Sequence, residues 1–561
     1  MAHDVLDLIR KCGASREARR AAYGTRRLWY LRGTDRSGPS ARYNKLKSHL
    51  KTLTSYLYAP ESARFTLHVP VQDRKEYLDH VGIARDAFVD VWRDSGADVS
   101  FEQYVTWALV YSASIVKILP DPAFGAVPQW VFPGDFGVLR EDLPELDRQE
   151  AFTHTFSLTL GEVTQLTRGM APDAQAKVLL WAEEHATPAV TGSGALPQLL
   201  QQVLVTNTSG DFFGSGRRGA LDLGAQGLDT PENEEPLVEC TEVWEVRDFK
   251  TPSGTVYRDY WVTTVIGEWP IIERRNPVLP YVDQPLGPPI PAENPFIAVI
   301  PNPLLDYFWG ASELTPLVAL QQWREERMNQ IDRVFALGLD PPLFFSGVTL
   351  PDDKIAAFRK PGGYVASPQP GAKMEPLRPE LPTEAFQVIG QIDQMFSDAA
   401  GMPEILQGQN AEGVRAGNQL GTLAGIAAGG RIRDQALIVE DALEIVTTRQ
   451  FHLLQRMDPT AYPLPDPKQT FLLAKLPQPV TVRVSAHSAS PVYAEQTLAK
   501  AQLLKQANAI SLPDFVDLID PPHRGDLVEK ARILEQQQAE QQKAVFDLKK
   551  REVELKGKPK S

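Results

Sequence analysis

Cysteine is scarce in this sequence, with Cys12 and Cys240 as the only two in 561 residues. Two cysteines cannot build a disulfide framework or a cysteine-rich zinc site, and such scarcity is typical of a reducing compartment. Long apolar runs are missing too, because the best candidate, residues 104–116, ends at Lys117. A membrane-spanning helix needs about 20 apolar residues. Charged residues also interrupt the N-terminus, which lacks the apolar core of a signal peptide. We therefore expect a soluble protein made in the cytoplasm.

Catalytic signatures are absent from the sequence as well. It contains no G-x-x-x-x-G-K-[ST] P-loop, no G-x-S-x-G nucleophile elbow and no H-E-x-x-H zinc motif. The nine histidines are scattered, and no two of them stand at the spacing of metal ligands. The acidic stretches PENEEP and REDLPELD have no basic pattern beside them. We therefore predict no enzyme activity, no metal site and no cofactor.

What the sequence does contain is typical of a large folded protein. Hydrophobic residues make up 43% and charged residues 23%. The net charge is −13, but residues 1–50 hold twelve Lys or Arg against four Asp or Glu. Such a basic segment can contact nucleic acid or an acidic partner, or it can be a solvated helical face. The sequence leaves both interpretations open.

Hydrophobic periodicity predicts an α+β chain that is mainly helical. Three- and four-residue spacing of apolar residues predicts helices over 4–32, 42–58, 76–96, 101–119, 172–186 and 195–206. Alternation of polar and apolar residues predicts strands over 150–160, 237–246, 255–265 and 269–275. The stretch 207–235 is rich in Gly, Asp and Glu and predicts a long loop.

Two long helices are expected after Pro303. The first covers 311–339, with Ser312 as its N-cap and the sequence DPP as its stop. Residues 340–380 then predict a compact module of short strands and turns. The second helix covers 382–400, is capped by Thr383 and carries five apolar residues that we expect on one face: Phe386, Ile389, Ile392, Phe396 and Ala399.

A glycine-rich stretch, GMPEILQGQNAEGVRAG, follows from Gly401 to Gly417. It has few apolar side chains and cannot build a core, so we expect a pliable polar loop. A helical stretch over 418–457 comes next, and its repeated G-x-x-x-G spacing predicts close packing or a kink. The chain ends with a short strand over 479–486 and a charged helix over 524–556.

The order of these elements resembles the portal proteins of tailed bacteriophages. The resemblance rests on IPNPLLDYFWGASELTPLVALQQWREERMNQIDRVFALGLDPPLFFSG and IDQMFSDAAGMPEILQGQNAEGVRAGNQL, and upstream on YNKLKSHLKTLTSYLYAPESARFTL. It covers about 40–460 and is strongest over 305–440. It implies a portal-type subunit with wing, stem helices, clip and helical crown. The implied parts are a basic N-terminal arm (1–40), the wing (41–305, with an insertion at about 165–235), stem helix 1 (306–339), the clip (340–380), stem helix 2 (381–400), the tunnel loop (401–417), a long kinked helix returning to the wing (418–480), and the crown and C-terminal tail (481–561).

The resemblance also implies a function. Portal subunits form a ring, usually of twelve, at one capsid vertex, and double-stranded DNA passes through it without sequence specificity during packaging and ejection. The ring nucleates head assembly from the major capsid and scaffold proteins. It docks the large subunit of the terminase and the head-completion adaptor and tail proteins. The expected location is the virion, after synthesis in the host bacterial cytoplasm, with no membrane partner.

Three sets of residues are candidates for these roles. A channel through which DNA slides needs few fixed cations, because phosphate contacts bind tightly. The tunnel-loop set fits that need and comprises Glu404, Gln407, Gln409, Asn410, Glu412 and Arg415. The clip set, expected to dock the motor and adaptor, comprises Asp352, Asp353, Lys354, Arg359 and Lys360. The stem set, expected to set the register between subunits or to form solvated intrahelical pairs, comprises Arg324, Glu325, Glu326, Arg327, Asp332 and Arg333.

Two other classes of function stay open. A magnesium-dependent nucleic-acid hydrolase would need two or three carboxylates that converge at strand ends, and the sequence nominates no such set. Another virion or scaffold protein, such as a monomeric adaptor with a charged helical tail, would explain the C-terminal residues. The long helix pair that brackets a small module argues against it.

Overall fold

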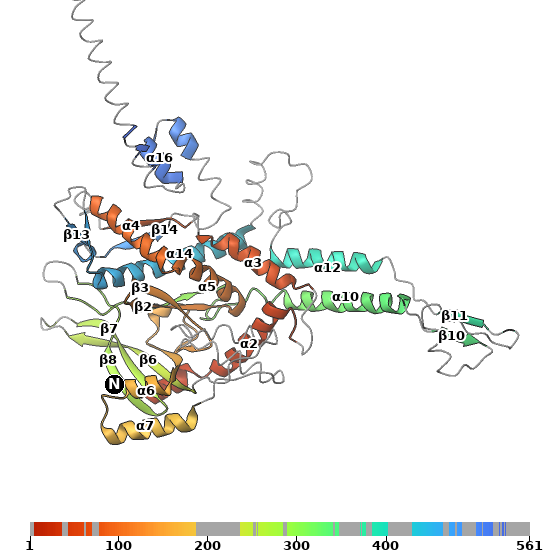
Figure 1. The fold of residues 1–561 in the computed structure, drawn as a ribbon, viewed down its shortest axis with the longest axis horizontal. Helices are drawn as coiled ribbons and strands as arrows, with labels where there is room; N and C mark the ends of the chain where they lie inside the picture. Colours follow the sequence, from red (N-terminus) through yellow and green to blue (C-terminus); the bar gives the residue numbers. More distant parts are fainter. Residues whose placement is uncertain are drawn as a thin grey trace, which may run out of the picture.

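The computed structural model has a mixed body of helices and sheets from which two long helices project (Figure 1). Among the described residues, helices hold more residues than strands, and the strands of the two largest sheets pair antiparallel. The fold is therefore of the α+β class. The structure describes residues 5–35, 43–60, 63–69, 78–186, 236–250, 254, 256–283, 289–339, 343–346, 371, 373–376, 384–401, 429–463, 470–476, 479–484, 501–507, 509–519, 527, 530, 531, 533 and 534.

Two antiparallel sheets form the centre of the body. One has five strands in the order β4-β5-β6-β7-β8, and the other has three in the order β3-β2-β9. Aromatic rings of Phe152, Trp244 and Phe296 lie 5.4, 5.5 and 6.0 Å apart and join the two sheets. The bounds are β2 Ser114–Asp121, β3 Gly125–Val131, β4 Phe136–Val138, β5 Ala151–Thr159, β6 Leu237–Lys250, β7 Val256–Ile266, β8 Trp269–Arg275 and β9 Phe296–Val299.

Helices pack on the three-stranded sheet and bury the main core. Helix α14 contacts all three of its strands, and α5 contacts them as well. Leu50, Phe88, Phe101 and Val439 are fully buried in this layer, each from a different helix. Its helices are α3 Lys45–Leu57, α4 Leu78–Asp94, α5 Ala97–Tyr111 and α14 Gly429–Met457.

The helix predicted over 101–119 is wrong in its second half. Helix α5 ends at Tyr111, and β2 begins at Ser114. Ser112 adopts a left-handed conformation, with φ of 90°, and its N–H donates to the carbonyl of Ala108. The residues that follow are rich in β-branched side chains, which favour a strand once the helix has ended. The apolar run could not distinguish a buried helix from a buried strand.

The expected helix over 4–32 is also interrupted. It forms α1 (Val5–Cys12) and α2 (Arg16–Arg32), with a turn at Gly13 between them. Helix α1 packs on β5 and β6, and α2 packs on α3 and α5. These residues are therefore part of the body.

Two further helices lie against the five-stranded sheet (Figure 1). Helices α6 (Leu160–Leu166) and α7 (Pro172–His185) occupy the described part of the expected insertion. Trp181 of α7 approaches Gly267 so closely that a Cβ there would lie 2.9 Å from its ring. Gly267 also has φ of +59°, so only glycine fits this turn without strain. The helix predicted over 195–206 and the loop over 207–235 lie outside the described residues.

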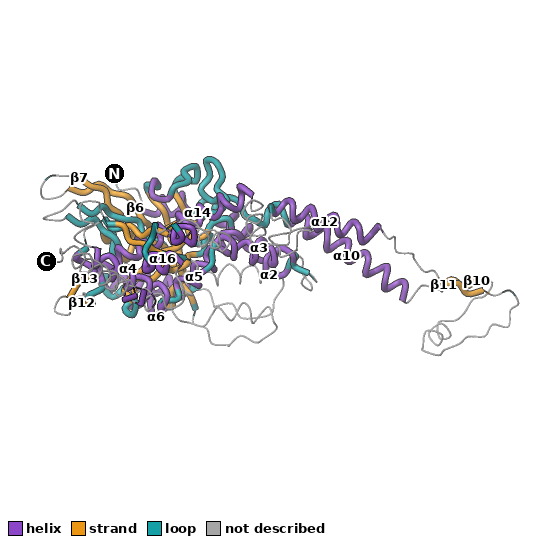
Figure 2. Tube along the Cα trace, turned by 90° about the horizontal axis from the view of Figure 1, so that it is seen from above, coloured by secondary structure: helices purple, strands orange, loops and turns teal. Residues whose placement is uncertain are grey.

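The helix pair consists of α10 (Val318–Leu339) and α12 (Glu384–Ala400), which lie side by side in both views (Figures 1 and 2). Beyond their far ends, β10 (Leu343–Ser346) pairs antiparallel with β11 (Lys373–Pro376). A helix of 22 residues such as α10 is about 33 Å long. The pair therefore reaches well away from the body.

Helix α10 begins seven residues later than the sequence predicted. The hydroxyl of Ser312 donates to the carbonyls of Leu109 and Val110, which ties the approach to α10 onto the end of α5. Turns occupy 313–317, and Pro316 within them has no N–H to donate. Ser312 is thus an anchor to the body and not a helix cap.

The remaining elements lie at the edge of the body and near the C-terminus. Most of the charged helix expected over 524–556, and residues 418–428 of the expected long helix, lie outside the described residues. The strand expected over 479–486 is β14, which pairs with β1. The elements are β1 Phe65–His68, η3 Leu146–Arg148, β12 Ala461–Pro463, β13 Thr470–Leu472, η6 Leu473–Lys475, β14 Thr481–Val484 and α16 Leu512–Ile519.

Candidate functional site: the helix pair and its junction with the body

A narrow apolar seam joins the two helices of the pair. Ile331 of α10 and Ile392 and Phe396 of α12 are buried in it or at its base. Phe386, predicted to share the apolar face of α12, is 54% exposed and lies at the edge of that face. Six residues turn a helix by about 600°, which places Phe386 some 120° away from Ile392.

An acidic side chain ties the pair to the body. Asp393 of α12 accepts hydrogen bonds from Arg324 Nε of α10 and Lys45 Nζ of α3, both at 3.0 Å. The Arg324 guanidinium also lies 5.0 Å from the ring centroid of Tyr43. Its side chain is only 13% exposed, so Arg324 is directed into its own subunit and is not available to another copy.

The other stem candidates lie on the outer surface of α10 or at its edges. Gln322 donates to Glu326 at 3.3 Å and Arg327 donates to Gln330 at 2.7 Å, so both charges have partners on their own helix. Arg333 is exposed. Glu325 and Asp332 are half-buried. Among the six predicted residues, Arg324 reaches across to Asp393 of α12.

Large apolar side chains remain exposed along the pair. Leu339, at the far end of α10, is 88% exposed, and Phe335 on the same helix is also exposed. Phe386 and Met395 are exposed on α12. Scattered exposed leucines are normal, whereas a large contiguous patch of exposed apolar side chains is typical of interaction surfaces. We call these residues, together with Trp323 and Leu337, the apolar stem set.

A buried carboxylate lies where the approach to α10 meets α14. Glu313 is 1% exposed, and its Oε2 accepts from Arg431 at 2.7 Å, Asn302 at 3.1 Å and Gln435 at 3.2 Å. Its Oε1 lies 3.5 Å from His49 Nε2 of α3. Burial alone raises the pKa of Glu313, but His49, Arg431 and Asn302 more than offset it, and the pKa falls below its usual value. Glu313 is therefore held ionised.

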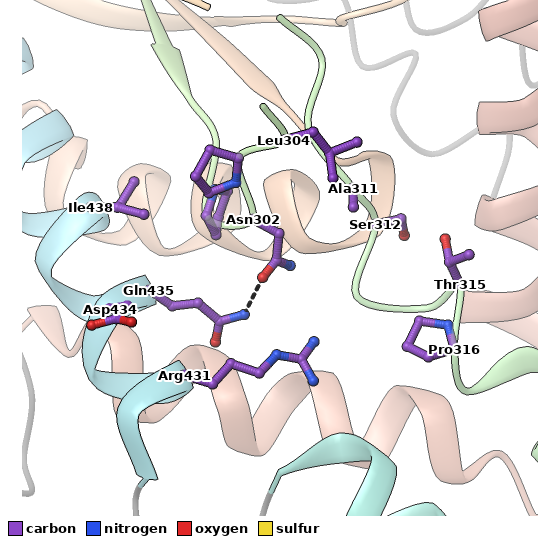
Figure 3. A pocket seen from close by; sticks show the side chains of 12 residues that line it. Asn302, Leu304, Ala311, Ser312, Thr315, Pro316, Arg431, Asp434, Gln435 and Ile438 are labelled. Atoms are coloured by element: carbon purple, nitrogen blue, oxygen red, sulfur yellow. Dashed lines mark hydrogen bonds between the residues drawn. The ribbon is translucent and has the colours of Figure 1, made fainter. Parts of the chain in front are cut away.

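The same cluster forms one wall of an open pocket of about 860 Å³ (Figure 3). Figure 3 shows Gln435 of α14 pointing toward Asn302, with the Arg431 side chain of the same helix beside it, and Gln435 Nε2 donates to Asn302 Oδ1 at 2.6 Å. The pocket is lined by Pro301, Asn302, Pro303, Leu304, Ala311, Ser312, Thr315, Pro316, Arg431, Asp434, Gln435 and Ile438. Arg431 contributes its half-exposed guanidinium, so solvent reaches this side of the cluster.

The other two candidate sets fall outside the described part of the chain. The tunnel-loop residues Glu404, Gln407, Gln409, Asn410, Glu412 and Arg415 lie between Gly401 and Gly429, and nothing in the structure tests them. The clip residues Asp352, Asp353, Lys354, Arg359 and Lys360 lie between β10 and β11. Both sets remain predictions.

Three arginines of the basic N-terminal segment contact the body, whereas Arg10 and Lys11 are exposed, and nothing in the structure tests a contact with nucleic acid or an acidic partner. Arg19 is buried, donates to the Phe136 carbonyl at 3.1 Å and lies 3.7 Å from the ring centroid of Trp309. Arg20 pairs with buried Asp135, and Arg26 donates to the Tyr111 carbonyl at 2.8 Å. These arginines fasten α2 to the body. Pattern alone could not reveal this, because their partners are backbone carbonyls and acids more than 80 residues away.

A second buried polar cluster joins the two sheets. Lys117 of β2 donates to Glu242 of β6 at 2.8 Å, and Trp244 Nε1 donates to the same carboxylate at 3.2 Å. His154 of β5 lies 3.6 Å from Glu242. Burial, reinforced by the Lys117 charge, lowers the pKa of His154 to about 4. The carboxylate is fully engaged by these neighbours, so the cluster acts as a structural link.

We also searched the described residues for metal sites and for membrane-spanning helices. They include no group of three or more His, Cys, Asp or Glu side chains placed to hold a metal ion. None of their helices has both the length and the apolar content needed to cross a membrane.

No protein-family model matches this chain, and no curated protein matches it either.

Proposed function

We propose that this protein is a portal subunit of a tailed bacteriophage, which assembles into a ring that conducts double-stranded DNA at the capsid vertex. The observation that carries the proposal is the helix pair, which projects from the body and leaves the apolar stem set exposed. A small two-stranded sheet lies beyond the pair, where the resemblance expects a clip. The order of body, helix, small module and returning helix matches the expected order along the chain.

A ring gives the exposed apolar surface a partner. In a head-to-tail ring each subunit presents two different surfaces, and rotation closes the assembly without a free end. Burial of apolar area stabilises by about 25 cal/mol per Å², so Phe335, Leu339 and Phe386 would supply attraction between neighbours. Exposed ion pairs contribute under about 1 kcal/mol. Glu326, Arg327 and Arg333 would therefore fix the alignment of neighbouring subunits more than they would strengthen the interface.

Charge favours a conduit over a DNA-binding protein. The chain carries −13, and Arg19 and Arg26 of its basic segment donate to backbone carbonyls of the body. Tight duplex binding needs several free cations aligned on phosphates. We propose that the tunnel-loop residues, whose only cation is Arg415, face the DNA. The described residues on either side of this segment, Gly401 and Gly429, follow the end of α12 and begin α14.

The remaining partners follow from the same proposal. The clip residues, which lie in the sequence between β10 and β11, would dock the large terminase subunit and later the head-completion and tail proteins. The body would contact the major capsid and scaffold proteins. No cofactor or catalytic step is needed for these roles.

The assembled mass and shape of the purified protein test this proposal. We expect ring-shaped particles with a central hole and a mass of about twelve times 62.2 kDa, seen by native mass measurement and negative-stain imaging. Some portal-type subunits need scaffold to assemble, so the sample is measured again with scaffold and capsid proteins. A chain that stays at 62.2 kDa under both conditions contradicts the proposal and favours a monomeric adaptor.

A further inference from the structure

One arginine bridges the ends of two helices that flank residues 402–428. Arg431, in the first turn of α14, donates from one terminal nitrogen to the carbonyl of Ala399 at 3.2 Å. Its other terminal nitrogen donates to Glu313 Oε2 at 2.7 Å. Ala399 is the penultimate residue of α12. The side chain therefore joins the C-terminal end of α12 to the N-terminal end of α14.

The chemistry of this contact requires an arginine. The last carbonyls of a helix have no partner within the helix, so the Ala399 carbonyl needs an outside donor. The buried Glu313 carboxylate needs a cation in a fixed place. A planar guanidinium can serve both acceptors at once, whereas a lysine presents a single nitrogen.

The position of Arg431 opposes the local preference of its own helix. A cation in the first turn of a helix is unfavourable, because the macrodipole is positive at that end. The same cation is favourable at the C-terminal end of α12, which it reaches. Arg431 is therefore unfavourable for α14 alone, but it stabilises the end of α12 and the Glu313 carboxylate. Arg431 thus contributes to the junction and not to the stability of α14 itself.

We propose that Arg431 is a positioning residue that fixes the end of α12 and the start of α14 relative to each other. Glu313 holds Arg431 in place, and Asn302 and Gln435 hold Glu313. Arg431 is 41% exposed on the pocket side, so its loss removes the bridge without opening the core around Glu313. The bridge is a property of the single chain and does not depend on the proposed function. Its importance for DNA passage rests on the proposed function.

Hydrogen exchange of the full-length protein tests the bridge directly. Arg431→Ala is expected to raise amide exchange about tenfold in peptides covering 391–401 and 429–438, since a hydrogen bond to a charged group is lost at each end. Arg431→Lys is expected to raise exchange only in 391–401, because one ammonium stays with Glu313 and leaves the Ala399 carbonyl. Arg433→Ala, an exposed arginine on the same turn, is the matched control and should change neither peptide.

Two outcomes overturn the inference. Unchanged exchange in Arg431→Ala shows that the bridge positions nothing. An increase spread evenly over the body, including β2 and β3, shows a general structural role. The particle mass is measured on the same samples, so a failure of the ring is seen separately. If the wild-type protein forms no ring, the proposed function fails while the exchange result still decides the role of Arg431.

Discussion

The body and the helix pair place the same kinds of side chains in opposite environments. In the body, Trp92, Trp244 and Trp309 are fully buried. Along the pair, Phe335 and Phe386 face outward. The largest aromatic side chains of the body are thus covered within a single chain, whereas these two of the pair are not. We therefore expect folding stability to reside mainly in the body, in agreement with the proposal that the pair contributes to assembly.

Charged groups follow the same division. Some charged groups of the body are buried and engaged with specific partners, as in the Lys117–Glu242 pair and the contacts of Arg19. On the outer side of the pair they lie in solvent or pair along one helix, as Arg327 does with Gln330. Loss of a body charge should therefore cost much more stability than loss of a charge on the pair.

The largest expected effect is Lys117→Met in the body. It leaves the Glu242 carboxylate buried without its main cation, and breaking one partner of a buried pair costs about 3–5 kcal/mol of unfolding free energy. Urea unfolding of the purified protein measures this. Combining it with Glu242→Gln should recover much of the loss, since no unpaired charge remains. A loss below about 1 kcal/mol for the single variant would contradict a tightly specified body.

The next effect is a loss of stability in mild acid. The pKa of His154 is about 4 in the folded chain against 6.5 for an ordinary histidine, because burial and Lys117 disfavour its charged form. The unfolded state binds the proton first, so this contribution is present above pH 6.5 and is lost as the pH falls to about 4. It is on the order of 3 kcal/mol. His154→Gln should flatten this part of the pH profile of urea unfolding.

Asp135 acts in the opposite direction over part of the same range. Burial raises its pKa to about 6 although Arg20 opposes the shift. The folded state therefore binds the proton first, and stability rises as the pH falls from about 6 toward 3.8. Comparing His154→Gln with Asp135→Asn separates the two slopes. If both variants kept the wild-type profile, neither residue would govern the acid response.

A smaller effect is expected at the base of the pair. Asp393→Asn weakens the contacts that Arg324 and Lys45 make across α3, α10 and α12. Asp393 is partly exposed, so we expect a loss of about 1 kcal/mol or less. Faster amide exchange in α10 and α12, with an unchanged exchange rate in the two sheets, is the expected result. Equal acceleration in both regions would show that the pair and the body unfold together.

The smallest effect on single-chain stability is expected for Phe386→Ser. Its side chain is exposed, so unfolding free energy should stay within about 0.5 kcal/mol of the wild type. Assembly should nevertheless fall sharply, which native mass measurement detects. Leu180→Ser, an exposed apolar residue of α7 in the body, is the matched control and should assemble normally. Normal assembly of Phe386→Ser would remove that residue from the proposed interface.

Sequence patterns predicted the long periodic elements well and the junctions poorly. The helix pair, α7 and strands β5 to β8 carry strong 3.6- or two-residue periods, and they occur where expected. The strand β2 was missed because a short, fully buried apolar run shows neither the helical nor the strand periodicity of polar and apolar residues. The roles of Arg324, Arg431 and Ser312 were also missed, because each side chain contacts atoms supplied by residues distant in the sequence.

Side-chain footprinting of the assembled protein tests the central claim most directly. Hydroxyl-radical labelling would follow Trp323, Phe335, Phe386 and Met395 of the pair, with Leu180 and Val256 of the body as references. We expect the four pair residues to be strongly protected from labelling in the ring relative to the single chain, while the two reference residues of the body are still labelled. Equal labelling of the pair in ring and single chain would contradict the claim that neighbouring copies cover it.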